Sequence, residues 1–189
     1  MKKLMTAVAL AAITSASQAA EVNGISVADT LPGSANQSEL RLVDLASQNY
    51  YYLDNAYVGA VYQSEQASAP ERVEFIVTSD RISGRALGVS LYETMALQLE
   101  WDQYEALEPQ MSSMVKMLDT KLEKGDRVVV TYSASKGAEV FVKGEYKGTL
   151  QGENLFALTA ASWLKQDTQL DAVSGIAQTS SQQQDSLPL

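Results

Sequence analysis

Hydrophobic positions along the chain change period three times, and each change predicts a change of secondary structure. The first half carries short apolar runs with the period of two that is typical of strands. The clearest covers residues 72–78, RVEFIVT, in which Val73, Phe75 and Val77 share one face. Further strands are predicted at 21–32, where Pro32-Gly33 ends the segment in a turn, at 39–45 and at 48–63.

The period then becomes helical. From Gly84 to Trp101 apolar residues recur about every four positions, which predicts a long helix with most of its surface covered. A second helix is predicted over 104–118, with Pro109 in its first turn or at a bend.

Strand periodicity returns after Gly125-Asp126. A strand is predicted near 127–132, followed by a hairpin around Lys143-Gly144, where glycine supplies the positive φ of a tight turn. A third helix is predicted over 153–165, and residues 169–189 have too little apolar content to pack, so we expect a disordered tail. Segregated strands and helices indicate an α+β fold, with helices on one face of a largely antiparallel sheet.

The N-terminal twenty residues have the pattern of a signal peptide. Lys2 and Lys3 precede an apolar run over 4–13, and Ser17-Gln18-Ala19 fits the small-x-small cleavage pattern. We expect cleavage near Ala19 or Ala20, export, and in a Gram-negative source a periplasmic location. The run is too short to span a bilayer, so no transmembrane segment is expected. One domain over residues 21–168 remains, and we expect a monomer.

Charge and composition exclude several classes of function. Without the two signal lysines the chain has twelve basic and twenty-three acidic residues, a net charge of about −11. Because phosphate binding depends on Lys and Arg, nucleic acid is not an expected partner. The chain has no Cys and no His, which excludes Ser-His-Asp and Cys-His catalysis and thiolate or imidazole metal sites. We expect no cofactor and no metal.

Five of the nine tyrosines lie within residues 48–63. Tyr51, Asn55 and Tyr57 are predicted to alternate onto one face, where they would line a cleft of mixed polarity. The alternative is that the tyrosines are ordinary strand formers whose hydroxyls reach water or backbone carbonyls.

Several weak motifs occur together in order. AYVGAVY on a strand is followed by ERVEFIVTSDRIS, KGDRVVVTY, AEVFVKGEYKGTL and a closing helix that ends in SWL. In this order and spacing the chain resembles the chalcone isomerase-like family, including its exported bacterial members, from about Val22 to Lys165. The resemblance implies an open-faced β-sandwich: a large antiparallel sheet covered by a layer of helices, with a ligand cleft between them. The family includes isomerases that cyclise chalcones and relatives that bind fatty acids, and fold alone does not choose between these activities.

The resemblance also assigns site positions. The arginine that pairs with the substrate oxyanion or a fatty-acid carboxylate falls on Asn49, give or take one residue, and Gln48 and Tyr50 are uncharged as well. The enzymes' threonine corresponds to Tyr57. Their tyrosine and asparagine fall near Ala86 and Glu93, where the neighbouring Tyr92 keeps a phenol in the cleft. Loss of the cation argues against chalcone cyclisation, because nothing at that position stabilises an anion.

Three hypotheses follow. The first is a non-catalytic exported protein that binds a small apolar or amphipathic, fatty-acid-like ligand between sheet and helices. The second is an isomerase or lyase on an enone-type substrate, in which Arg85 or Arg41 supplies the charge and Tyr92 the proton. The third is a cell-envelope protein-interaction module, which requires an exposed apolar patch. Glu93 is a possible buried base in the second hypothesis, with a solvated helix face as the alternative.

Overall fold

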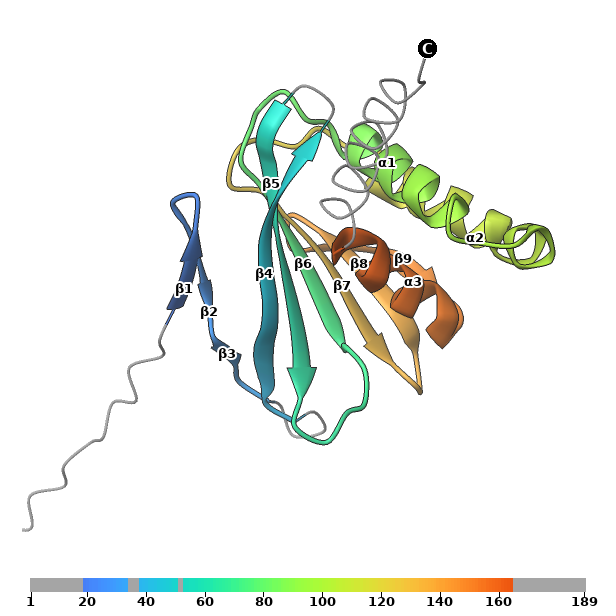
Figure 1. Cartoon of the computed structure of the whole chain (residues 1–189), viewed down its shortest axis with the longest axis horizontal. Helices are drawn as coiled ribbons and strands as arrows, with labels where there is room; N and C mark the ends of the chain where they lie inside the picture. The colour runs from blue at the N-terminus through green and yellow to red at the C-terminus, as the bar shows by residue number, and fades with distance from the viewer. Residues whose placement is uncertain (1–18, 34–37, 51–52, 165–189) are drawn as a thin grey trace, which may run out of the picture.

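Seven strands form a curled antiparallel sheet in the order β3-β4-β5-β6-β7-β8-β9 (Figure 1). The computed structural model describes residues 19–33, 38–50 and 53–164. The sheet strands are β3 (Thr30–Leu31), β4 (Leu40–Tyr50), β5 (Leu53–Ser64), β6 (Arg72–Val77), β7 (Arg127–Ser133), β8 (Gly137–Val142) and β9 (Glu145–Leu150). The short strands β1 (Ala19–Val22) and β2 (Ile25–Ala28) form a separate hairpin. The helices are α1 (Gly84–Ala96), α2 (Trp101–Leu118) and α3 (Glu153–Leu164).

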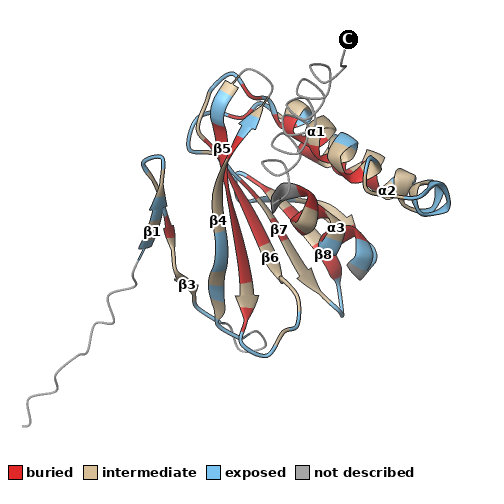
Figure 2. Ribbon diagram, in the orientation of Figure 1, coloured by how far each residue is buried: buried red, intermediate tan, exposed pale blue. Residues whose placement is uncertain are grey.

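Strand alternation divides the buried residues into two cores. On β5, Tyr57 and Val61 belong to the core under the helices, whereas Val58, Ala60 and Tyr62 belong to a smaller core on the opposite face. The same period of two holds on β6 and β7, so each strand supplies one side chain in two to each face. Figure 2 shows that β5 and β6, the central strands, are buried along most of their length.

The helices lie on one face only. α3 contacts β5, β7 and β8, and the antiparallel pair α1–α2 packs against α3, with α2 also reaching β9 (Figure 1). The close approach of α1 and α2 depends on two glycines one helical turn apart. A Cβ at Gly84 would stand 2.0 Å from the carbonyl oxygen of Leu118, and one at Gly88 would stand 3.0 Å from Cα of Val115. Met111 and Met114 on α2 are fully buried in the main core.

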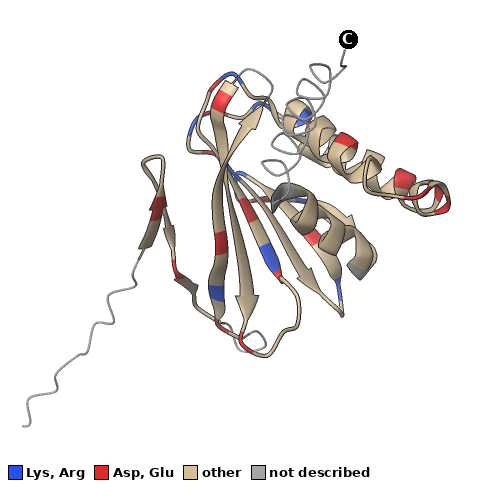
Figure 3. Cartoon of the chain, viewed as in Figure 1, with Lys and Arg blue, Asp and Glu red and all other residues tan. Residues whose placement is uncertain are grey.

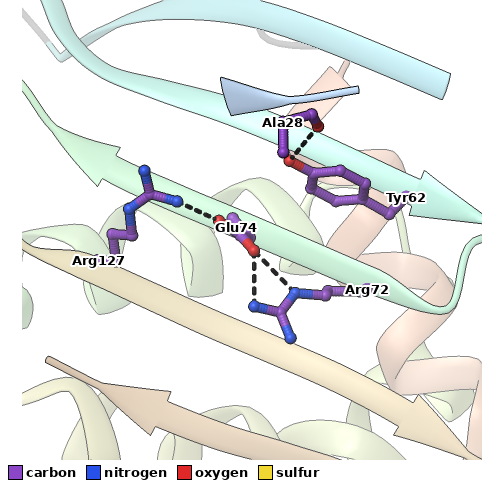
Figure 4. Close-up of polar contacts among 5 residues, drawn as sticks. All are labelled: Ala28, Tyr62, Arg72, Glu74 and Arg127. Carbon is purple, nitrogen blue, oxygen red and sulfur yellow. Dashed lines mark hydrogen bonds and ion pairs between the residues drawn. The ribbon is translucent and has the colours of Figure 1, made fainter. Parts of the chain in front are cut away.

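The opposite face of the sheet is partly covered by the β1–β2 hairpin. The β1–β2 hairpin packs over β4 and β5 through Val27, which is 1% exposed. Beyond the hairpin, the Glu74 carboxylate is buried beside two arginines (Figure 4). Its oxygens lie 2.6 Å from Nη2 of Arg72 and 2.8 Å from Nη1 of Arg127. A buried carboxylate requires such partners, because burying a lone charge is costly.

The α+β class and the one-sided helix layer predicted from the sequence are confirmed, as is the Lys143-Gly144 hairpin, where both turn residues have positive φ. Three boundaries were wrong. Within the predicted strand 48–63, residues 48–50 end β4 and residues 53–63 form most of β5, so two strands stand where one was predicted. Residues 21–32 contain a hairpin with its turn at Asn23-Gly24. The first helix ends at Ala96, and the second begins at Trp101, so Pro109 lies in its interior.

Two predicted segments lie outside the described residues. These are most of the signal peptide, residues 1–18, and the whole predicted tail, 169–189. Ala19 and Ala20, near the predicted cleavage point, are described and pair with Ala28 and Val27. Within the described part of the chain no helix is long and apolar enough to cross a membrane.

Candidate ligand-binding site

Two pockets of about 580 Å³ each open in the helix layer. The first, the hairpin pocket, lies where α1 ends and α2 begins, and its walls are Tyr92, Glu93, Ala96, Leu97, Leu99, Trp101 and Tyr104. The second, the groove pocket, lies between α2 and α3, and its walls are Leu99, Gln103, Ala106, Leu107, Asn154, Ala157, Leu158 and Ala161. Because both include Leu99, the two pockets adjoin. Their size and apolar lining are those of small-molecule sites.

The hairpin pocket forms because the chain turns sharply between the two helices. Leu97 is the C-terminal cap of α1, and its backbone N–H bonds to the carbonyl of Glu93 at 3.1 Å. α2 starts within four residues, and its first turn is closed by Gln103, whose Oε1 accepts from the backbone N–H of Glu100 at 3.3 Å. The turn leaves Leu97 and Trp101 78% and 72% exposed at the pocket mouth. An apolar surface of this kind is available to a ligand.

Two phenols meet on one wall of the hairpin pocket. The hydroxyl oxygens of Tyr92 and Tyr104 lie 2.7 Å apart, within hydrogen-bond distance. This hydrogen bond, together with partial burial and the nearby Glu108 carboxylate, raises the pKa of Tyr92 to about 12. A phenol is protonated at neutral pH, so Tyr92 forms an uncharged part of the pocket wall. The rings of Trp101 and Tyr104 lie 5.8 Å apart and tilted by 31°.

The groove pocket exists because small residues face each other across two helices. Ala106 on α2 and Ala157 and Ala161 on α3 leave space that larger side chains would fill. The polar groups in its wall are the amides of Gln103 and Asn154. The groove thus offers an apolar channel with neutral hydrogen-bonding groups.

Of the seven predicted site residues, Tyr92 and Glu93 line the hairpin pocket. Glu93 is exposed at its rim rather than buried. Ala86 lies in the first turn of α1, where its backbone N–H bonds to the Ser83 hydroxyl at 3.1 Å, so that hydroxyl caps the helix. Tyr51 lies outside the described residues. None of the described members except Tyr92 and Glu93 lines either pocket.

Asn49 and Asn55 form part of the irregular end of the β4–β5 pair. Both are exposed, and the side-chain oxygen of Asn49 accepts from the backbone N–H of Asn55 at 2.8 Å. Asn55 has a φ of +50°, and its side-chain oxygen accepts from Ser47 and Asn23 at 2.9 and 2.7 Å. The left-handed backbone at Asn55 breaks the period of two. Asn55 and Tyr57 therefore do not share a face as predicted, and Tyr57 is 1% exposed in the main core.

Gln48 is a candidate that sequence reasoning did not select. It pairs in register with Tyr57, on the helix-facing side of the sheet, and is 1% exposed. Its side-chain oxygen has no hydrogen-bond partner among the described residues. A buried acceptor of this kind accommodates a donor from water or from a ligand. A register argument from Val58 and Ser47 identifies its face, but burial cannot be read from the sequence.

The two arginines proposed for an altered isomerase site lie away from both pockets. The Arg41 side chain is 57% exposed and pairs with Glu65 at 2.7 Å, and that of Arg85 is 66% exposed and pairs with Asp119 at 3.2 Å. Neither is near enough to line a pocket with Tyr92. The arrangement that the isomerase hypothesis requires, an arginine and a phenol converging on one point, is not formed by these residues.

In the described part of the chain, no group of three or more Asp and Glu residues is arranged to hold a metal ion.

Comparisons with known proteins identify the family and the fold. The family model described as chalcone isomerase-like matches residues 19–171. Among solved structures, the chain is similar to a fatty-acid binding protein from Arabidopsis thaliana, with a TM-score of 0.54 and 12% sequence identity over 78% of this chain and 87% of that one. At that identity the likeness concerns the fold. No curated protein matches the sequence significantly.

Proposed function

The chain belongs to the chalcone isomerase-like family, and from this premise we propose that it is a non-catalytic binding protein for a small apolar or amphipathic molecule held in the helix layer. The observation that carries the proposal is the pair of adjoining apolar pockets that meet at Leu99. The fatty-acid binding protein of similar fold supports the same class of ligand.

The proposed ligand position differs from the cleft expected between sheet and helices. The space under the helices contains the main core, with Tyr57, Met111 and Met114 each at most 1% exposed. The pockets instead lie within the helix layer, between α1 and α2 and between α2 and α3. The α2–α3 groove suits a ligand with an alkyl chain, because alanine and leucine side chains form most of its wall.

A binding role also accords with the lack of a suitably placed cation. At the position where the family resemblance assigns an arginine, Gln48, Asn49 and Tyr50 are uncharged. Anion stabilisation of the order of 3 kcal/mol therefore has no source there. Cyclisation through an oxyanion is accordingly not part of the proposal.

The proposal includes export. Residues 1–20 have the composition of a Sec-type signal peptide, with cleavage near Ala19 or Ala20 and, in a Gram-negative source, delivery to the periplasm. Cell fractionation and the intact mass of the purified protein test this part, and a full-length mass in the cytoplasmic fraction contradicts it.

Binding is tested first by native mass spectrometry of the protein purified from cells, with extraction and identification of any bound molecule. A stoichiometric amphiphile supports the proposal. The purified protein is then titrated with dodecanol, an uncharged chain, beside the variant Ala157→Phe, which places a ring in the groove. Because Ala157 is exposed, the larger side chain is tolerated by the fold.

We expect Ala157→Phe to weaken dodecanol binding about tenfold or more, which corresponds to about 1.4 kcal/mol. The control Ser68→Phe adds the same ring at an exposed site in the β5–β6 connection and leaves binding unchanged. A protein that is purified bare and shows no mass shift with dodecanol or dodecanoate contradicts the proposed function.

A further inference from the structure

The hairpin pocket differs from the groove in its aromatic content. Tyr92, Trp101 and Tyr104 all contribute to a single pocket. Trp101 is 72% exposed, so part of its surface is free of protein contacts. Its ring lies 5.8 Å from that of Tyr104, and the Tyr104 and Tyr92 hydroxyls are in contact. Aromatic faces grouped in this way attract cations, and tryptophan does so most strongly.

The charge around the pocket has one sign. Residues 86–115, which span most of α1 and α2, contain five acidic residues and no lysine or arginine: Glu93, Glu100, Asp102, Glu105 and Glu108. Figure 3 shows acidic residues along the helices α1 and α2 and in the turn that joins them. Basic residues lie near the opposite end of α1. Glu93 itself lines the pocket, and no lysine or arginine within residues 86–115 is available to pair with an anionic head group.

From these two features we propose that the hairpin pocket binds a quaternary ammonium group, and that the ligand of this protein is a cationic or zwitterionic amphiphile. Its trimethylammonium head lies against Tyr92, Trp101 and Tyr104, beside the Glu93 carboxylate. Its alkyl chain passes Leu99 into the α2–α3 groove. The position of the ligand's alkyl chain rests on the proposed function above, whereas the head-group site depends only on the hairpin pocket.

The chemistry favours a methylated cation over other head groups. A trimethylammonium group spreads its charge over methyl groups, donates no hydrogen bonds and is therefore suited to an apolar aromatic pocket. A carboxylate in the same place is repelled by Glu93 and its neighbours. This distinguishes the expected ligand from a fatty acid, even though the alkyl chain is the same.

The test compares three ligands with the same twelve-carbon chain, below their micelle concentrations and at low salt: dodecyltrimethylammonium, dodecanol and dodecanoate. We expect dodecyltrimethylammonium to bind about tenfold more tightly than dodecanol, and dodecanoate to bind most weakly. Because the advantage is electrostatic, it shrinks when the ionic strength is raised. Tetramethylammonium chloride, which has no chain, tests the head-group site alone.

Two pairs of variants separate the head-group contacts from folding. Trp101→Ala reduces the affinity for dodecyltrimethylammonium about two- to fivefold, and Trp101→Phe retains most of it, because a phenyl face also attracts a cation. Glu93→Gln reduces it as well, while Glu65→Gln, which removes an exposed carboxylate that lines neither pocket, does not. The dodecanol affinity stays constant across Glu93→Gln and Glu65→Gln.

The outcomes are distinguishable. Equal affinity for the three twelve-carbon ligands, or tightest binding of dodecanoate, overturns the head-group inference and leaves the proposed function standing. Binding of tetramethylammonium with no dodecanol binding supports the head-group site and overturns the groove. Dodecylphosphocholine identifies the source of the cation: affinity equal to that of dodecyltrimethylammonium indicates a choline lipid, and much weaker affinity indicates a free quaternary amine, since the phosphate then meets the acidic rim.

Discussion

At the scale of single residues, Tyr62 shows how burial alters a side chain's chemistry. It lies under the β1–β2 hairpin at 1% exposure, and its hydroxyl donates to the backbone carbonyl of Ala28 at 3.1 Å (Figure 4). Burial first, and then the nearby Glu74 carboxylate, raise its pKa to about 12, against the opposing effect of Arg127 and Arg72. The phenol is thus held protonated in the folded protein over a range in which an exposed tyrosine ionises.

This raised pKa predicts a specific loss of stability in alkali. Between pH 10 and pH 12 the unfolded chain releases the Tyr62 proton while the folded chain keeps it, so the free energy of unfolding falls as the pH rises. At pH 8 the variant Tyr62→Phe is less stable than the wild type by about 1 kcal/mol, because the bond to Ala28 is lost. Urea unfolding at pH 8, 10 and 11.5 should show this difference shrinking. If the difference in the free energy of unfolding stays constant with pH, the Tyr62 phenol does not stay protonated in the folded protein above pH 10.

Two of the predicted site residues, Tyr92 and Glu93, lie on the regular helix α1 and line the same pocket. Tyr92 was placed in a ligand site from the sequence, and it lines the hairpin pocket. Asn55 was placed on the face of Tyr57, and its positive φ breaks the alternation on which that placement depended. The burial of Gln48 depends on contacts with distant strands and helices, and no local pattern reports these.

At the scale of elements, the hairpin pocket was missed because the first helix was extended to Trp101. The apolar spacing of Leu91, Met95 and Leu99 continues through the true end at Ala96. Glu100 and Gln103 indicate the start of a second helix at this point. An acidic residue followed three positions later by glutamine fits a helix N-terminus. Asn23-Gly24 was likewise a strong hairpin signal that the segment's apolar pattern obscured.

The two glycines of α1 predict contrasting effects of the same substitution. In Gly84→Ala the new Cβ meets the Leu118 carbonyl oxygen at 2.0 Å, and since that atom is backbone, α1 and α2 must separate. We expect a loss of about 1–3 kcal/mol. In Gly88→Ala the contact with Val115 is 3.0 Å, and the gain in helix propensity of about 1 kcal/mol offsets it. Urea unfolding of both variants checks this, and equal destabilisation would contradict the steric argument.

At the scale of the whole molecule, one sheet separates two cores, of which only the one under the helices lies on the side of the pockets. The face under the helices forms the larger core and supports both pockets, and the opposite face is partly covered by the β1–β2 hairpin. The sheet and helix layer were predicted from periodicity, because alternating and four-residue spacings are local. The hairpin's position over β4 and β5 was not predicted, since it depends on a chain reversal and on packing far along the sequence.

This division predicts that stability and binding respond differently to truncation on the two faces. Val27→Ala and Leu155→Ala each remove a side chain that is 1% exposed, and we expect losses of about 1–2 and 2–5 kcal/mol. Leu155 anchors α3, which forms one wall of the groove pocket, whereas Val27 packs on the far side of the sheet. Dodecanol affinity should therefore fall in Leu155→Ala and stay unchanged in Val27→Ala, measured at a temperature where both variants are folded. An equal loss of affinity in both variants would mean that the sheet transmits changes between its faces. The face covered by the β1–β2 hairpin would then contribute to the ligand site.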